Sequence, residues 1–252
     1  MLGYTLPEWL LIFYIYCFLG WCFETTYVSL RTGHRVNRGF MKAPMLPLYG
    51  SGALLLLVIG RVFSDNMWLA YIVSCIGAML LELVTGITME WLFKIKYWDY
   101  SRQKIQYKGH ICLSSTLVWG LFGLLVNRVL HEPIEGLVLG LPKLVAGSIS
   151  FAVTVWLGLD LVQSFREAWR MRKILINLEL TREDILKQKK QISYVIALDA
   201  CQDQNNLRLR HILRKQRHAM EGYLQELWGI LYNIQKELTA KYEVHLSIFK
   251  KI

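Results

Sequence analysis

The sequence lacks the short motifs that mark familiar soluble catalytic sites. It contains no P-loop and no GxGxxG, HExxH or GxSxG pattern, and its five cysteines form no CxxC pair. Nucleotide hydrolysis and a zinc site built from paired cysteines therefore have no recognisable motif in this chain. We expect the chain to use no cofactor, leave any metal unassigned, and expect an ATPase, if one is needed, to be a separate chain.

Charged residues are also scarce, at 19% of the chain, whereas hydrophobic residues make up 54% and the mean hydropathy is +0.31. This composition is too apolar for an ordinary water-soluble protein. The charges that are present sum to +10, from 29 Lys and Arg against 19 Asp and Glu. Such an excess of positive charge is compatible with binding to nucleic acid, with binding to anionic lipid, or with basic loops that orient membrane spans. The distribution of the charges along the chain distinguishes these alternatives.

Five apolar stretches are long enough to cross a hydrocarbon core, which takes about 20 helical residues. They occupy residues 7–30, 44–63, 67–93, 111–130 and 139–162. The first stretch has neither the basic start nor the cleavage site of a signal peptide, so we expect it to remain in the protein. The sequence predicts an all-α, polytopic bundle of about five transmembrane helices over residues 1–163.

Basic residues in the connecting loops indicate the orientation of these spans. The first and third loops are strongly basic, whereas the second and fourth are not. The basic side chains of the first and third loops are Arg31, Arg35, Arg38, Lys42, Lys94, Lys96, Arg102, Lys104 and Lys108. The positive-inside rule places these loops in the cytoplasm, and so predicts a protein of the cell membrane with its N-terminus outside and its C-terminus inside. Much of the positive charge is then a topology signal, and nucleic acid is not an expected partner.

Residues 164–252 show long helical periodicity without transmembrane-length apolar runs. A heptad pattern is clearest over Met220, Leu224, Leu227, Leu231, Ile234 and Leu238. The polar segment 201–206 is the best candidate for a turn between two helices. We predict a cytoplasmic helical hairpin or coiled coil, which either joins copies of the chain into a homo-oligomer or packs on itself as a small appendage.

Three glutamates lie within predicted spans, where an ionisable group costs about 2.5–3.5 kcal/mol and so calls for a partner or a function. Glu24 and Glu82 fall at a similar depth in the cytoplasmic half of the bilayer, counting about 1.5 Å per helical residue. Glu82, Gly86 and Glu90 follow one another at four-residue spacing and so share one helix face. We predict a polar, carboxylate-containing cavity between the first three spans.

Polar and aromatic residues from the loops border the same level. The predicted substrate- or ion-binding residues are Glu24, Arg38, Tyr49, Glu82, Glu90 and Asp99. The predicted supporting residues are Trp21, Gly39, Gly50, Gly86, Trp98, Tyr100, Gly109 and His110. In such a cavity Arg38 neutralises one glutamate, and a carboxylate pair shares a proton or binds a cation. The alternative is that the glutamates are static partners that hold helices together.

Several motifs in a fixed order resemble a known family. They are FLGWCFETTY, NRGFMKAPMLPLYGSG, LELVTGITMEWLF, WDYS, and GHICL followed by Trp119 and Gly120. Together they are similar to the bacterial ABC-transporter type IV (CmpB-like) membrane protein family, over roughly residues 10–160. The family's pattern falls on Trp21, Glu24, Arg38, Gly39, Pro44, Tyr49, Gly50, Glu82, Gly86, Glu90, Trp98, Asp99, Tyr100, Gly109 and Trp119.

The resemblance implies a permease-like membrane subunit of a transport system with a separate ATPase subunit as partner, rather than an enzyme. Two other functions remain open from the residues themselves. One is a membrane-embedded enzyme that acts on a lipid-linked substrate, with a glutamate as acid or base. The other is a non-catalytic sensor or scaffold that recruits partners through its coiled coil, with structural glutamates.

Overall fold

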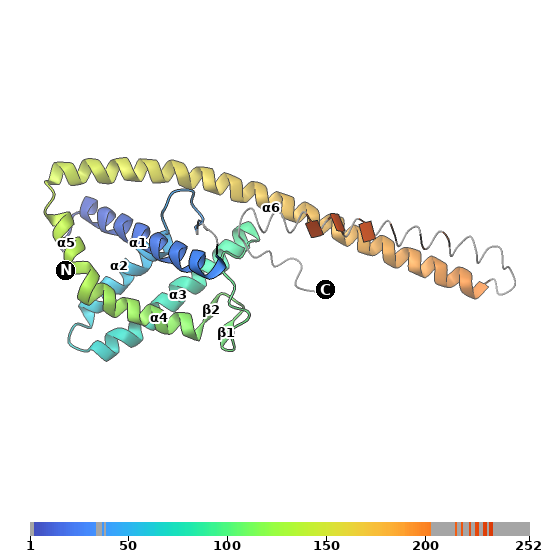
Figure 1. Cartoon of the computed structure of the whole chain (residues 1–252), viewed down its shortest axis with the longest axis horizontal. Coiled ribbons are helices and arrows are strands. Elements are labelled where there is room, and N and C mark those ends of the chain that lie inside the picture. The colour runs from blue at the N-terminus through green and yellow to red at the C-terminus, as the bar shows by residue number, and fades with distance from the viewer. Residues whose placement is uncertain are drawn as a thin grey trace. The chain divides into compact units, whose positions relative to one another are not determined.

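The computed structural model describes residues 3–33, 37 and 39–202, together with 215, 218, 222, 225–226, 229–230 and 232–233. It forms two compact units, Met1–Trp169 and Arg170–Ile252. The first unit is a helical bundle (Figure 1), which confirms the predicted all-α class. In order, its elements are α1 (Leu6–Thr32), α2 (Pro47–Val62), α3 (Met67–Phe93), β1 (Gln106–Tyr107), β2 (Ile111–Cys112), α4 (Leu113–Leu125), η1 (Val126–Leu130), α5 (His131–Leu139) and the beginning of α6 (Lys143–Gln202).

Four helical segments among the described residues are long and apolar enough to cross a membrane. They are Leu6–Arg31, Met67–Phe93, Leu113–Leu139 and Lys143–Thr181. Helix α2 is apolar but has only 16 residues, about 24 Å of helix against a hydrocarbon core of about 30 Å. The helix predicted over residues 111–130 continues to Leu139, and the next one begins at Lys143.

The outer surfaces of these helices carry large apolar side chains. The most exposed include Leu144 at 83%, Trp68 at 74%, and Trp91 and Phe151 at 71% each. Water would not tolerate so much continuous apolar surface, whereas lipid chains match it. The chain is therefore a membrane protein whose helices contact the bilayer.

Local sequence signals explain where the first and third helices begin and end. At the start of α1, the Glu8 carboxylate accepts a hydrogen bond of 2.6 Å from the backbone N–H of Thr5, and Gly33 ends the helix at φ +76°. At the start of α3, the side chain of Asn66 accepts a hydrogen bond of 3.0 Å from the backbone N–H of Leu69. These caps satisfy backbone groups that the helix ends would otherwise leave without partners.

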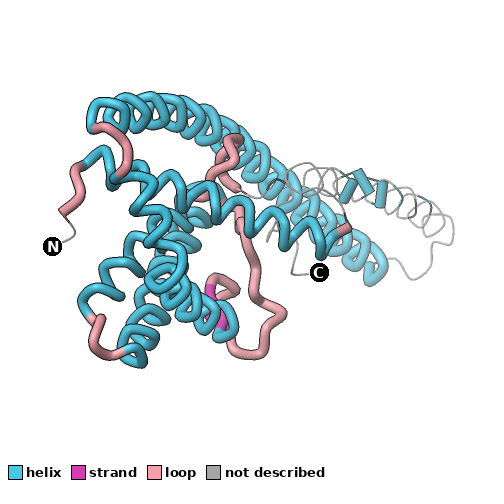
Figure 2. The backbone as a smooth tube through the Cα atoms, turned by 60° about the vertical axis from the view of Figure 1, so that its left-hand side comes forward, coloured by secondary structure: helices cyan, strands magenta, loops and turns pink. Residues whose placement is uncertain are grey.

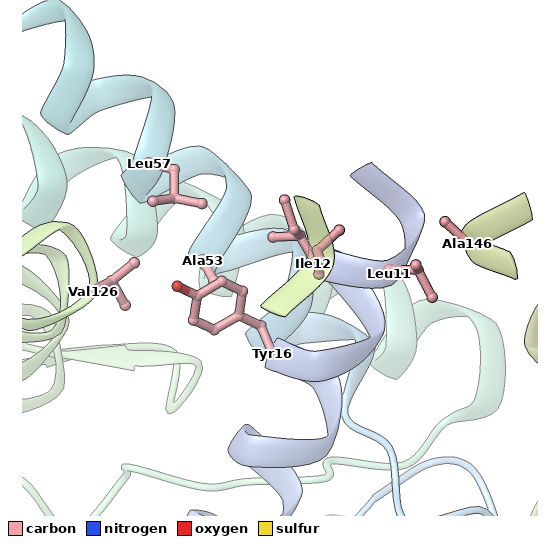
Figure 3. Close-up of a cluster of buried hydrophobic side chains, with 8 residues drawn as sticks. Leu11, Ile12, Tyr16, Ala53, Leu57, Val126 and Ala146 are labelled. Atoms are coloured by element: carbon pink, nitrogen blue, oxygen red, sulfur yellow. The ribbon is translucent and has the colours of Figure 1, made fainter. Parts of the chain in front are cut away.

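Consecutive helices pack against each other, and one buried cluster joins most of the bundle. Side chains from α1, α2, η1, α5 and α6 meet there, as Figure 3 shows. The members are Leu11, Ile12, Tyr16, Ala53, Leu57, Val126, Val138 and Ala146. This cluster ties residues near both ends of the first unit together, so helix packing rather than local propensity fixes the arrangement.

The membrane helix Leu113–Leu139 contains a π turn, η1, in which the N–H of His131 bonds to the carbonyl of Val126. Proline explains its place in the sequence. Pro133 has no N–H to offer to the carbonyl of Val129, and its ring would clash with that carbonyl in a regular α-helix. Widening the preceding turn relieves the clash.

The segment between α3 and α4 folds into a short antiparallel hairpin, β1–β2, visible as the two magenta pieces in Figure 2. Its turn uses two residues with left-handed backbone, Lys108 at φ +49° and Gly109 at φ +75°. The sequence did not predict this hairpin. His110 in its turn lies against Gly86 of α3, and Tyr100 in the loop before it reaches Glu82 of the same helix.

Polar contacts with α6 and α1 hold the irregular segment that precedes α2. The backbone N–H of Ala43 donates to the Asp160 carboxylate over 3.1 Å, and Lys42 forms an ion pair with Glu167. The backbone N–H of Leu46 donates to the carbonyl of Cys17 in α1 over 3.0 Å. The backbone N–H groups of Ala43 and Leu46 are thus satisfied by neighbouring helices.

The six positions of the predicted heptad seam lie outside the described residues. Of the predicted turn at residues 201–206, Cys201 and Gln202 are still helical at the end of α6, and residues 203–206 lie outside the described part of the chain. The coiled coil therefore stays a prediction.

Candidate functional site

Glu82 is the most deeply buried acid among the described residues, with 3% of its surface exposed. Its Oε1 accepts a hydrogen bond of 3.0 Å from the hydroxyl of Tyr100, and its Oε2 accepts one of 2.7 Å from the hydroxyl of Ser115. The side chain of Trp119 also approaches the carboxylate. Each of these three neighbours is neutral, and among the described residues no positively charged side chain forms an ion pair with Glu82.

Glu24 belongs to the same polar group through Tyr49. The Tyr49 hydroxyl donates to Oε2 of Glu24 over 2.9 Å, and its ring packs on Trp119 with 5.2 Å between ring centroids. The two carboxylates are close enough for Glu24 to act electrostatically on Glu82. We call the six residues Glu24, Tyr49, Glu82, Tyr100, Ser115 and Trp119 the carboxylate cluster. It draws on α1, α2, α3, α4 and the loop before β1.

Glycines let the helices of the cluster approach closely. A Cβ on Gly20 would lie 2.2 Å from the Cβ of Tyr49, and a Cβ on Gly52 would lie 3.1 Å from the ring of Trp119. No larger residue fits at Gly20 without moving Tyr49 away from Glu24. Close helix contact and the position of the hydrogen-bonding tyrosine are therefore set by the same residue.

A second polar group, the histidine cluster, lies beside it and consists of Glu90, Lys96, Trp98 and His110. Nε2 of His110 is 3.0 Å from Oε2 of Glu90, and Nζ of Lys96 is 3.7 Å from the same oxygen. The indole N–H of Trp98 donates to the carbonyl of His110 over 2.7 Å. A Cβ on Gly86 would meet His110 at 3.0 Å, so this glycine opens the place that the imidazole occupies.

Other predicted residues have different surroundings. The Trp21 indole donates to the side chain of Asn37 over 2.7 Å, and Gly50 packs against Cys17. Asp99 accepts a hydrogen bond from Ser101 and lies against Gly109, where a Cβ would approach its carboxylate to 2.6 Å.

Two predicted residues lie in the segment that joins α1 to α2. Gly39 lies there at a point where an added Cβ would touch Leu46. Arg38 lies outside the described residues.

Sequence reasoning missed Ser115 and Lys96 as partners of the glutamates. Ser115 follows β2 in the first turn of α4, and the packing of α4 against α3 brings its hydroxyl to Glu82. A serine in an apolar helix gives no signal of its own, because it bonds equally well to a backbone carbonyl. Lys96 was counted as a topology residue, although it pairs with Glu90.

The carboxylate cluster has the chemistry of a cation or proton site. Two acidic side chains that interact across a low-dielectric region are stabilised by a bound cation or by sharing protons. Burial and the negative charge of Glu82 raise the pKa of the Tyr100 phenol well above its ordinary value, so its hydroxyl stays protonated and remains a donor. In the part of the chain that the structure describes, no three His, Cys, Asp or Glu side chains group as metal ligands.

Comparison with known proteins identifies the family. The family model described as "Putative ABC-transporter type IV" matches residues 11–165. The chain belongs to this family. The match includes both clusters and ends within α6, so the carboxylates, the hairpin and the segment before α2 are all in the family region. Neither the curated proteins nor the solved structures gave a match.

The buried His110 predicts a pH-dependent stability. Burial lowers the pKa of its imidazole, an effect that exceeds the opposing attraction of Glu90 and Asp99, and Lys96 and Lys108 lower the pKa further. The unfolded chain therefore takes up a proton near pH 6.5 more readily than the folded one. We expect stability from this residue to be present above about pH 6.5 and to be lost as the pH falls toward the lower folded pKa.

Thermal unfolding in detergent between pH 7.5 and pH 5 checks this, with each melting temperature compared between the natural protein and H110Q. The variant is expected to lose less stability on acidification, because glutamine does not titrate. H218Q, at an exposed position, is the control for replacing a histidine elsewhere in the chain. Equal pH dependence of the natural protein and H110Q would show that the imidazole does not carry the effect.

Proposed function

We propose that this chain is a membrane subunit of a transport system and that the carboxylate cluster binds its substrate or coupling ion. The observation that carries the proposal is the buried Glu82, whose two oxygens accept hydrogen bonds from the neutral side chains of Tyr100 and Ser115, with no basic partner among the described residues. If Glu82 had a purely structural role, a basic partner would be expected, because an uncompensated buried charge strongly destabilises the folded protein. Membership of the ABC-transporter type IV family supports a role in transport.

We also propose an orientation of the chain in the membrane. The basic loops after α1 and α3 favour an N-terminus outside the cell and a C-terminus in the cytoplasm of a bacterial cell. The carboxylate cluster, which lies in the second half of both α1 and α3, would then open toward the cytoplasm. Residues 164–252 would form a cytoplasmic helical region that is available to bind partners or a second copy of the chain.

The chain would work with a separate ATPase, because no nucleotide-binding motif occurs in it. Affinity purification of the full chain from its own membranes, after mild crosslinking, tests this. The expected result is a co-purified subunit that hydrolyses ATP. The control is a truncated chain without residues 164–252, which should lose the subunit if the cytoplasmic helices recruit it.

Three results would each overturn the proposal. Isolation of the chain alone, with no ATP hydrolysis in any fraction, would show that the chain is not a subunit of an ATP-driven transport system. Conversion of a lipid-linked substrate by the pure chain in detergent would instead favour the membrane enzyme. Full function of a chain lacking both Glu24 and Glu82, together with loss on deletion of 164–252, would favour the scaffold.

A further inference from the structure

A pocket of about 400 Å³ lies at the other end of the bundle, where α2 ends and α3 begins. The helix running from α4 through η1 into α5 forms its other wall. None of the residues of the carboxylate or histidine clusters lines it. Its volume lies in the range of small-molecule sites, which is about 300–1,000 Å³.

Charged side chains of both signs line this pocket: Arg61, Arg128, Glu132 and Glu135. Within the described part of the chain, neither arginine forms an ion pair with either glutamate. Glu135 is fixed by the hydroxyl of Tyr4, whereas Arg61, Arg128 and Glu132 make no side-chain hydrogen bond among the described residues. Two guanidinium groups, the Glu132 carboxylate and the second oxygen of Glu135 are thus available to a ligand.

The walls of the pocket are held in place by a specific contact. The side-chain amide of Asn127, in the π turn, donates to the carbonyl of Leu56 in α2 and to the carbonyl of Gly123 in α4, over 2.8 Å in each case. Gly60 makes room for it, since a Cβ there would lie 2.2 Å from the Asn127 side chain. Arg128 follows directly in the same π turn, a kind of turn that is frequent at functional sites. The arginine therefore projects from a backbone that is fixed before any ligand arrives.

We propose that this pocket binds a zwitterion that carries a phosphate and a primary ammonium group, as in phosphoethanolamine. Arginine binds phosphate through two parallel hydrogen bonds, so Arg61 and Arg128 take the anionic end. Glu132 and the free oxygen of Glu135 take the ammonium group. A simple anion would be repelled by the two glutamates and a simple cation by the two arginines, so the mixed lining selects a ligand with both charges.

The ligand has two sources, the free compound or the head group of a phospholipid. Apolar residues Leu57, Phe63, Met67 and Leu124 also line the pocket and are compatible with a lipid glycerol and its upper chain. Titration of the full-length protein in detergent with O-phosphoethanolamine tests the free ligand. Native mass spectrometry after extraction from nanodiscs of phosphatidylethanolamine or of phosphatidylcholine tests the lipid, because the choline group cannot donate hydrogen bonds.

We expect R61Q and E132Q each to weaken binding at least about tenfold, the effect of losing one charge-assisted contact. R102Q, in the exposed loop before β1, is the matched control and should bind as the natural protein does. E132Q should also bind inorganic phosphate more tightly, because it removes a repelling charge. R128Q serves as a second anion-site variant if R61Q does not fold, with melting temperature as the check.

Binding of either the free compound or the lipid supports the proposal and identifies the source. If the protein binds neither the free compound nor the lipid, the proposal is wrong. Equal affinity for inorganic phosphate and O-phosphoethanolamine also overturns it, as does unchanged binding in folded R61Q, R128Q and E132Q. These outcomes are independent of the carboxylate cluster, so they neither support nor oppose the proposed transport role.

Discussion

Replacing Glu82 with glutamine is expected to weaken cation binding at least about thirtyfold and to remove cation-dependent stabilisation of the folded protein. Losing the charge of a buried binding group costs about 2 kcal/mol or more, which corresponds to this factor. The glutamine has nearly the same shape and its carbonyl still accepts a hydrogen bond. Changes in packing are therefore small compared with the change in charge.

Melting temperatures in detergent measure the effect, with Na⁺, K⁺, Mg²⁺ or Ca²⁺ exchanged for a bulky organic cation at constant ionic strength. A ligand at one hundred times its dissociation constant stabilises the folded state by about 2.7 kcal/mol, a shift of several degrees. The natural protein should show such a shift with at least one cation or on protonation, and E82Q should not. The exposed Glu183, replaced by glutamine, is the matched control. Identical responses of the natural protein and E82Q would show that Glu82 is not part of a cation-binding site.

Introducing alanine at Gly20 is expected to destabilise the bundle by about 1–3 kcal/mol, the usual cost of overpacking. The added Cβ would lie 2.2 Å from the Cβ of Tyr49, an atom next to the backbone of α2 that a side-chain rotation cannot move. The two helices must therefore separate. Because Tyr49 binds Glu24, the same change should also reduce cation binding.

The control for G20A is G158A, in α6. Nothing lies within 4 Å of a Cβ at Gly158, so alanine there should stabilise the helix by about 0.5–1 kcal/mol through its better helix propensity. Denaturant unfolding in mixed micelles compares the two variants with the natural protein. Equal stability of G20A and G158A would show that α1 and α2 do not depend on this close approach.

Much of the candidate site followed from depth along the predicted helices. Glu24 and Glu82 were paired because both occur in the second half of an apolar helix, and the structure brings them close enough to interact. Their connection through Tyr49 and Trp119 could not be predicted. It depends on the crossing of α1 and α2 at Gly20 and on the packing of α4, which involve residues far apart in the sequence.

The partners of Glu90 could not be predicted from the sequence either. Its helix face was predicted from the four-residue spacing with Glu82 and Gly86, but its partners His110 and Lys96 come from the loop that follows α3. A short hairpin with two left-handed residues gives too weak a pattern to be recognised in an apolar sequence. Its position became known only from the fold.

By itself, the sequence determined that this protein is helical and lies in a membrane, since long apolar runs have no other stable environment. It also determined which acids are unusual, because a charge within an apolar run stands out against its neighbours. Only the tertiary structure decided which neutral groups hold Glu82, and that a separate pocket collects arginines and glutamates from α2, η1 and α5. The reason is physical: hydropathy is a property of single segments, whereas hydrogen bonds and pockets arise between segments that only packing brings together.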